Sequence, residues 1–402
     1  MYYVQSCSNN KFSFPKNLLS LDDTHFRSLG ILIANSISEA ERVYVLDACL
    51  GSHRLGQQKV RIITDSANIA LYFRHMLVPH PETNPSLFHY NLVVYIATSL
   101  KIPNSKEYAL TSDSFAASNP ERGILLISNV KNTETITDAI LAAVGSRVIH
   151  EEIPSLPIQA HIMYHRGKSA LVIDPSKLLV CAVPEETYFN GFHSALWNSH
   201  GVFHMFGGVA HQNLKAPRSR GDLVEMTLHG DVTNARVIQP LHNLVPKVPP
   251  PTTLVFVIRD ITGILPGLAK LAPQVASKYL AAGYGGKPNQ LQPFYFQHRL
   301  VSPFGKLEKL FEELAVAHHT RIYLCNIKRR DGTELTRNEI ENILLTSLDN
   351  SLDQSPPERD DVLKCDVIKS VRGVSTSLDP LQGWQKDEYV SKAKRFASLI
   401  GI

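Results

Sequence analysis

The sequence predicts a two-lobed α/β protein with mixed sheets. A chain of 402 residues exceeds the roughly 250 to 300 residues at which one hydrophobic core stops growing, so we expect two lobes. Apolar residues make up 44% and charged residues 19% of the chain, which is typical of folded globular proteins and not of disordered ones. β-Branched apolar runs alternate with amphipathic stretches, and this pattern predicts strands interleaved with helices.

The first half of the chain opens with a predicted hairpin. Residues 42–48 and 59–64 are β-branched apolar runs, and turn-forming residues 51–58 lie between them. Apolar residues at three- and four-residue spacing then predict a helix at residues 65–77. Two further strands and one further helix are expected at residues 92–96, 123–128 and 132–144, respectively.

The second half of the chain continues the alternation of predicted strands and helices. Residues 169–183 predict a strand, a turn at residues 174–177 and a second strand. The remaining predicted strands are residues 202–206, 223–228, 235–238, 254–258 and 322–327. The remaining predicted helices are residues 266–282, 306–318, 339–348 and 389–400.

The cysteine pattern and the net charge narrow the class of protein. The cysteines are scattered without a CxxC pair, which disfavours zinc or a disulfide framework and favours buried thiols in a reducing compartment. They are Cys7, Cys49, Cys181, Cys325 and Cys365. No stretch approaches the roughly 20 continuous apolar residues of a membrane span, so none is expected. The net charge of +4 is mild and permits RNA or anionic partners without indicating them.

Several segments resemble, in the same order, the sequence patterns of one known family. VYVLDACLG followed by KVRIITDSANIALYFRHMLVP resembles the family's V-D-x-x-x-G and V-R-x-x-T-E pattern of strand, hairpin and helix. Residues 259–267 lie on the family's A-D-x-x-G-V-L-P-P stretch almost position for position. The segments IYLCNIK, ELTRNEIENILLTSLDN and LDPLQGWQKDEYVSKAKRFASLI resemble a later strand and the last two helices of the family. The chain thus resembles the ATP-dependent phosphoenolpyruvate carboxykinase family.

This resemblance runs from Glu41 to Ile400 and implies a two-lobed carboxykinase-like fold with mixed sheets. It predicts an N-terminal extension at residues 1–40, an N-terminal lobe at residues 41–168 and a nucleotide-binding-like lobe at residues 169–402. The implied activity is the conversion of oxaloacetate and ATP to phosphoenolpyruvate, carbon dioxide and ADP.

The phosphate loop that the resemblance implies is absent from its expected place. In the family, a glycine-rich loop ending in G-K-T holds the phosphates through backbone N–H groups and a lysine. Its place here is taken by Asp174, Pro175, Ser176 and Lys177, with no glycine. Pro175 lacks an N–H donor and Asp174 would repel an anion, so we expect the phosphate loop to be lost. Residues 167–169 spell G-K-S, but they precede the strand and are interpreted as unrelated to phosphate.

The metal ligands that the resemblance implies are also replaced. The family's metal-binding aspartates fall on Phe192 and His193, and a hard cation prefers carboxylate oxygen, which phenylalanine lacks. The neighbouring acids become Asn198, Ser199 and His200. The lysine and histidine of a second metal fall on Thr137 or Asp138 and on Ile158. We therefore expect no metal site and no cofactor.

Three positions are retained as vestigial ligand-binding candidates. Arg236 resembles an arginine near the transferred phosphate, while Arg330 and Thr336 resemble positions that flank the nucleotide base and ribose. The alternative is structural: Arg236 pairs with an acid such as Glu225, and Thr336 caps the helix that begins near Glu339. Gly283, Tyr284 and Lys287 are also retained and are interpreted as helix-end geometry.

The replaced residues predict a pseudoenzyme with no catalytic residue and no small-molecule substrate. Its expected role is a structural or interaction subunit, with protein partners, of a larger mitochondrial assembly such as a ribosome or respiratory complex. Lys and Arg clusters, such as Arg218 with Arg220 or residues 328–330, are candidates for RNA contact or are solvated turns. Residues 1–21, which have no acid before Asp22, resemble a targeting remnant, and the cytoplasm is the other expected location. The alternatives are an active carboxykinase and a nucleotide-sensing binding protein.

Overall fold

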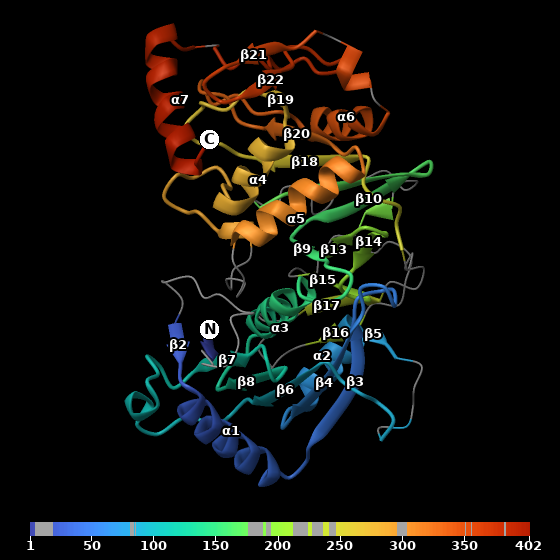
Figure 1. The fold of residues 1–402 in the computed structure, drawn as a ribbon, viewed down its shortest axis with the longest axis vertical. Helices are drawn as coiled ribbons and strands as arrows, with labels where there is room; N and C mark the ends of the chain where they lie inside the picture. The colour runs from blue at the N-terminus through green and yellow to red at the C-terminus, as the bar shows by residue number, and fades with distance from the viewer. Residues whose placement is uncertain are drawn as a thin grey trace. The chain divides into compact units, whose positions relative to one another are not determined.

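The computed structural model divides the chain into two compact units (Figure 1). It describes residues 1–4, 19–80, 84, 86–175, 188–189, 194–211, 224–226, 236–240, 247–295, 304–349, 351–354, 356–381 and 383–402. The first unit contains Met1–Ser155 and the described parts of Phe203–Pro246. The second contains Leu156–Val202, Lys247–Tyr295 and Phe304–Ile402, where described. The predicted mixed α/β class is confirmed.

The lobe boundaries expected from the resemblance differ from these units. The chain passes from the first unit to the second near residue 155 and returns for residues 203–246, whereas a single change at residue 169 was expected. The predicted extension at residues 1–40 also belongs to the first unit. There, α1 (Asp23–Ser38) buries Phe26, Leu29, Ile33 and Ile37, which recur at helical spacing.

The first unit is built on a mixed sheet with strand order β2-β1-β7-β8-β6-β4-β3-β5 among its described residues. Strands β4, β6 and β8 run parallel, and β3 pairs antiparallel with β4 as the predicted hairpin. Figure 1 shows α1 on one side of this sheet and α3 (Thr133–Val148) on the other. The strands are β1 (Tyr2–Val4), β2 (Leu19–Leu21), β3 (Tyr44–Leu50), β4 (Gln58–Thr64), β5 (Val78–Pro79), β6 (Leu92–Ala97), β7 (Phe115–Asn119) and β8 (Ile124–Ser128).

The helix α2 (Ala67–Met76) follows the hairpin, as predicted, with Ser66 accepting a hydrogen bond from the backbone of Ile69. It also contacts a small antiparallel sheet of order β15-β17-β16. These strands are β15 (Gly208–His211), β16 (Val224–Met226) and β17 (Arg236–Pro240).

The second unit has its own mixed sheet, with order β12-β10-β11-β18-β20-β19-β22-β21 among its described residues. Its centre is formed by three parallel strands, β11 (Lys168–Ile173), β18 (Thr253–Ile258) and β20 (Arg321–Asn326). The outer strands are β10 (His161–His165), β12 (Tyr188–Phe189), β19 (Leu268–Leu271), β21 (Glu358–Asp360) and β22 (Cys365–Val367). A separate sheet has the order β14-β13-β9, from β9 (Leu156–Ile158), β13 (Ala195–Asn198) and β14 (Gly201–His204).

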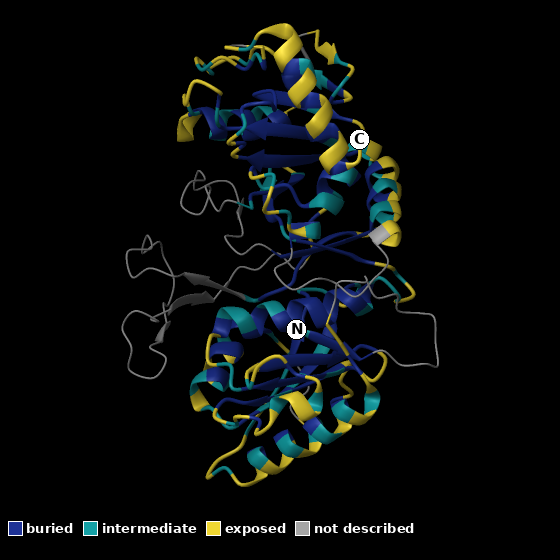
Figure 2. Ribbon diagram, turned by 90° about the vertical axis from the view of Figure 1, so that its left-hand side faces the viewer, coloured by how far each residue is buried: buried dark blue, intermediate teal, exposed yellow. Residues whose placement is uncertain are grey.

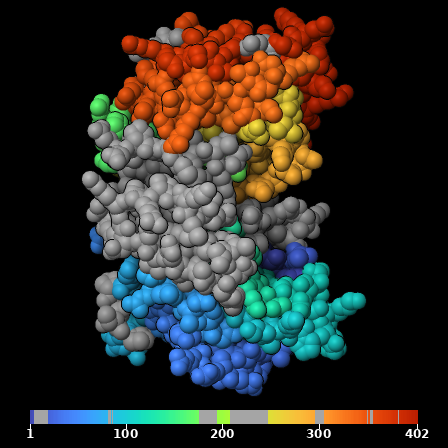
Figure 3. Space-filling view, turned by 180° about the vertical axis from the view of Figure 1, so that it is seen from behind, coloured from blue at the N-terminus to red at the C-terminus, as the bar shows by residue number. Residues whose placement is uncertain are grey.

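Helices cover both faces of this central sheet. Val255 and Val257 share a buried core with Ile343 of α6 (Arg337–Leu348). Phe256 points the other way and lies 6.1 Å, between ring centroids, from Tyr279 of α4 (Pro273–Ala282). The remaining helices are α5 (Phe304–Ala317) and α7 (Lys386–Ile400). Figure 2 shows buried strands in both units and exposed outer faces on the helices. Figure 3 shows the C-terminal residues, orange to red, as one continuous surface.

The predicted helix at residues 266–282 is wrong in its first part. Leu268–Leu271 forms β19, which pairs antiparallel with β20, and α4 begins only at Pro273. Strand pairing overrides the helix-like spacing of the apolar residues, and a proline is favoured at the first position of a helix. Within the described ranges, every helix is too short or too polar to span a bilayer.

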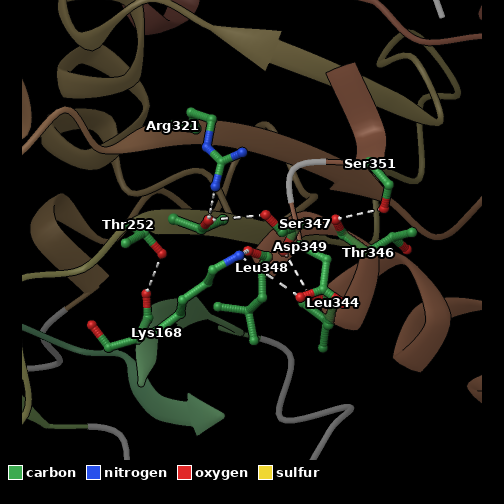
Figure 4. A network of polar contacts seen from close by, with 11 residues as sticks. Lys168, Thr252, Arg321, Leu344, Thr346, Ser347, Leu348, Asp349 and Ser351 are labelled. Carbon is green, nitrogen blue, oxygen red and sulfur yellow. Dashed lines mark hydrogen bonds and ion pairs between the residues drawn. The ribbon is translucent and has the colours of Figure 1, made fainter. Parts of the chain in front are cut away.

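The amino ends of the parallel strands meet the end of α6 in a polar network (Figure 4). Lys168 Nζ donates to the carbonyl of Leu348 at 3.1 Å and lies 3.9 Å from Asp349. Thr253 Oγ1 donates to the carbonyl of Ser347 at 3.1 Å. Lys168 therefore satisfies a helix C-terminus. The G-K-S tripeptide lies at the opposite edge of the sheet from the carboxyl ends of these strands, as its position before the strand predicted.

Candidate functional site

The carboxyl ends of β11, β18 and β20 lie at one edge of the central sheet because the three strands are parallel. Asp174 and Pro175 follow β11, and Arg259 and Asp260 follow β18. In open α/β sheets, ligands bind in the crevice outside the carboxyl ends of the strands. This edge is therefore where a ligand site is expected on physical grounds.

A pocket with a cavity volume of about 510 Å³ lies at this edge, within the second unit. Its lining combines two cations, one carboxylate, two amides, two glycines and two apolar side chains. The lining residues are Pro175, Arg259, Ile261, Gly283, Gly285, Lys287, Gln290, Gln292 and Glu334. Arg259 and Lys287 against Glu334 give the lining a formal charge of 2 − 1 = +1, which favours an anionic ligand.

Arg259 and Glu334 form an ion pair across the pocket lining. The Nη2 and Nε atoms of Arg259 donate to the same oxygen, Oε1 of Glu334, at 2.5 Å and 2.9 Å. The side chains are 43% and 36% exposed, respectively. A guanidinium has five N–H donors, so the pair leaves Arg259 with donors for a ligand.

Asp260 fixes the loop that presents Arg259. Its buried carboxylate accepts hydrogen bonds from the backbone N–H groups of Thr262, Ile264 and Leu265 at 2.9 to 3.0 Å. It also accepts one from the hydroxyl of Tyr284 at 2.6 Å. Burial, together with the nearby Asp260, raises the pKa of Tyr284, so this hydroxyl stays protonated and keeps donating.

The glycines after α4 allow the pocket wall to approach this loop closely. Gly283 ends α4 with φ +62° and its N–H donates to the carbonyl of Tyr279, which confirms the predicted helix-end geometry. A Cβ on Gly286 would lie 2.1 Å from the carbonyl oxygen of Arg259, so only glycine fits there. Lys287 lines the pocket, a position that the helix-end interpretation did not anticipate.

The residues in the place of the phosphate loop are only partly described. The side chain of Asp174 is fully buried, and its Oδ2 lies 4.0 Å from Nε2 of His161, which is buried as well. The carboxylate of Asp174 is therefore enclosed beside His161, and the loss of the phosphate loop stays a prediction. Pro175 does line the pocket. Ser176 and Lys177 lie outside the described residues.

The positions aligned with the family's metal ligands supply no metal site in the described part of the chain. Phe192 and His193 lie outside the described residues. Asn198 Oδ1 accepts the backbone N–H of His200 at 2.9 Å, and Thr137 donates to the carbonyl of Thr133 within α3. No three His, Cys, Asp or Glu side chains gather for a metal among the described residues, and the loss of the metal site stays a prediction.

Two of the three ligand-binding candidates have structural partners. The guanidinium carbon of Arg330 lies 3.6 Å from the ring centroid of Trp384, and its Nη2 lies 3.5 Å from Oε1 of Glu388. Thr336 caps α6, where its hydroxyl accepts the backbone N–H of Glu339 at 3.3 Å, as its alternative interpretation predicted. Neither residue lines the pocket, although Glu334 between them does.

The third candidate, Arg236, belongs to the first unit. Its backbone opens β17 and pairs with Met226, while Glu225 lies opposite Val237. The basic residues 328–330, considered for RNA contact, do not present three free cations. Arg329 is 6% exposed and donates from Nε to the carbonyl of Ser377, and Arg330 is paired. Arg218 and Arg220 lie outside the described residues.

The charged pocket residues Arg259, Lys287 and Glu334 were not assigned to a site from the sequence. A signal existed for Arg259, because it directly follows a buried parallel strand at the edge where ligands bind. Lys287 carried a different signal, since it is retained from the family pattern, but it was interpreted as helix-end geometry. Glu334 carried no signal. Lys287 and Glu334 come from two other loops, and only the folded loops bring them to the pocket.

Two curated proteins similar to this chain carry the name of an ATP-dependent enzyme. A phosphoenolpyruvate carboxykinase (ATP) of Campylobacter jejuni subsp. jejuni is 23% identical over 419 residues, covering 90% of this chain and 77% of the relative. A phosphoenolpyruvate carboxykinase (ATP) of Campylobacter lari is 22% identical over 452 residues, covering 98% and 83%. The prediction that this chain is not an enzyme is therefore wrong, because the names of these relatives point to an enzyme.

The match to a family profile covers more than half of the 402 residues. Residues 4–215 match the phosphoenolpyruvate carboxykinase family, which agrees with the order of segments noted in the sequence. The chain belongs to the phosphoenolpyruvate carboxykinase family.

Proposed function

We propose that this chain binds ATP, the nucleotide in the names of its relatives, in the pocket lined by Arg259 and Lys287. The observation that carries the proposal is the position of these two cations at the carboxyl edge of three parallel strands. Charge-assisted hydrogen bonds from arginine and lysine are the strong interactions available to phosphate oxygens. The carboxykinase reaction is the activity that the family relationship supports for this site.

The pocket would hold phosphates by side-chain charge and not by a backbone cradle. Pro175 has no N–H to donate, and the loop it belongs to contains no glycine between residues 174 and 177. Ile261 lines the pocket and is 51% exposed, so it offers an apolar surface for a planar base. Gln290 and Gln292 add amide donors and acceptors.

A thermal-shift titration with ATP, ADP and GTP tests the proposal, because a ligand that binds the native state raises the melting temperature. We expect Arg259→Gln and Lys287→Gln to reduce the shift. Lys278→Gln is the matched control, since Lys278 pairs with Glu308 and does not line the pocket. The same preparations should be assayed for conversion of oxaloacetate and ATP to phosphoenolpyruvate. No shift at millimolar ATP would contradict the proposal.

A second candidate role is the interaction role expected from the sequence. We propose that the chain also serves as a structural or interaction subunit of a larger mitochondrial assembly, such as a ribosome or respiratory complex. Affinity purification followed by size-exclusion chromatography tests this role. A chain that elutes as a monomer without a stable partner contradicts it.

A further inference from the structure

We propose that Glu334 is the specificity-determining residue of the pocket and accepts hydrogen bonds from the ribose hydroxyls of the bound nucleotide. The inference rests on the proposed nucleotide binding and adds which part of the ligand is recognised. A carboxylate is a strong acceptor for sugar hydroxyls, and an acidic residue fills this role in dinucleotide-binding α/β folds.

The backbone of Glu334 is held in place by a tight hairpin. The N–H of Arg329 donates to the carbonyl of Thr333 at 2.8 Å, and the N–H of Leu335 donates to the carbonyl of Ile327 at 2.8 Å. Lys328 and Glu334 form an antiparallel bridge, and Gly332 turns the chain with φ +88°. The side chain therefore leaves a fixed backbone and lines the pocket.

Arg259 orients the Glu334 carboxylate and neutralises its charge. Both hydrogen bonds from Arg259 reach Oε1, so Oε2 keeps its acceptor capacity for a ligand. Without this pair, an unneutralised carboxylate would repel the phosphates of the same ligand. The pair thus lets an acidic side chain lie in an anion-binding pocket.

The charged groups of the pocket then divide the ligand between them. Lys287 and the remaining donors of Arg259 serve the phosphates, whereas Glu334 serves the sugar. This arrangement predicts discrimination between ribonucleotides and deoxyribonucleotides. A site built to hydrogen-bond a hydroxyl binds the analogue without it more weakly, because the acceptor loses its partner.

Isothermal titration of the full chain with ADP, 2′-deoxy-ADP, 3′-deoxy-ADP and inorganic pyrophosphate tests the inference. We expect at least one deoxy analogue to bind about ten-fold more weakly than ADP to the unmodified protein. We expect Glu334→Ala to abolish this difference in affinity. Glu334→Gln, which keeps one carbonyl acceptor, should reduce it. Glu341→Ala is the control, because Glu341 pairs with Arg337 on α6 and does not line the pocket.

The outcomes separate this inference from the proposed function. If neither ADP nor pyrophosphate binds the unmodified protein, the proposed function fails. If ADP binds but both deoxy analogues bind equally well, Glu334 does not read the ribose and the inference is overturned. If Glu334→Ala changes the affinities for pyrophosphate and ADP equally and leaves the ratio between ADP and the deoxy analogues unchanged, Glu334 acts only through its charge. That result also overturns the inference.

Discussion

The guanidinium carbon of Arg330 lies 3.6 Å from the ring centroid of Trp384, and the same indole donates from Nε1 to the carbonyl of Gly263 at 2.9 Å. Trp384 therefore connects the segment before α7 to the loop after β18 and to the hairpin after β20. A Cβ on Gly263 would lie 2.7 Å from the Cα of Arg330, so the two loops touch at their backbones.

We expect Trp384→Leu to lower the free energy of unfolding by about 1 to 3 kcal/mol, because it removes a cation–π contact and a hydrogen bond. Urea unfolding measures the change, and Trp197, the other of the two tryptophans, remains as the fluorescent reporter. Leu399→Ala is the control on α7, since Leu399 is 40% exposed. Equal stability of Trp384→Leu and Leu399→Ala would contradict the role assigned to Trp384.

Glu339 is a buried carboxylate that joins the first turn of α6 to residues 375–376. It accepts backbone N–H bonds from Thr336 and Ser375 at 2.9 and 2.8 Å, and one from Thr376 at 2.9 Å. Burial opposes its ionisation, but these hydrogen bonds outweigh burial and hold the pKa of Glu339 well below its ordinary value of 4.5. The charged form is therefore the stabilising one.

We expect Glu339→Gln to cost about 2 kcal/mol of stability at pH 7, because the amide accepts fewer and weaker hydrogen bonds. A lowered folded-state pKa means that this stabilisation is complete above the unfolded pKa near 4.5 and is lost as the pH falls below it. Urea unfolding between pH 7 and pH 3 should show a steeper loss in the unmodified protein than in Glu339→Gln. Parallel pH profiles would refute this account.

The strands of the second unit could be predicted from the sequence, whereas the pocket could not. Residues 254–258 and 322–327 are β-branched apolar runs, and they form β18 and β20 nearly as predicted. Arg259, Lys287 and Glu334 come from three loops whose shapes depend on Asp260 and on the hairpin at Gly332. Asp260 and the hairpin act within their own loops, but the strand pairing that brings the loops together joins residues far apart in the sequence. Only Arg259 carries a local signal, its position directly after a buried strand.

His204 is fully buried at the end of β14. Its backbone N–H donates to Ser52 Oγ at 3.1 Å, and its carbonyl accepts the N–H of Ser52 at 2.8 Å. Burial lowers the pKa of His204 from 6.5 to about 3. The folded protein therefore holds a neutral imidazole where the unfolded chain binds a proton.

Because the unfolded chain binds this extra proton, the free energy of unfolding rises with pH between about 3 and 6.5. His204 contributes at most about 1.4 kcal/mol per pH unit to this slope. We expect His204→Leu to flatten the profile in this window. Urea midpoints at pH 4.5, 5.5 and 6.5 measure it, and His200→Leu is the control because His200 is exposed. A profile as steep in His204→Leu as in the unmodified protein would show that other groups carry the dependence.

Substitutions of Lys168 and Lys287 test the two edges of the central sheet separately. It caps the end of α6 through the carbonyl of Leu348, whereas Lys287 lines the pocket at the carboxyl edge. We expect Lys168→Met to lower stability by about 1 kcal/mol, since a helix-terminal carbonyl loses its charged donor, while the dissociation constant for ADP stays within about two-fold. Lys287→Met should do the reverse: the free energy of unfolding stays nearly unchanged, and the binding of ADP becomes weaker. Urea unfolding and calorimetric titration of both variants measure the two effects. Weaker ADP binding in Lys168→Met would mean that the G-K-S tripeptide contributes to the nucleotide site after all.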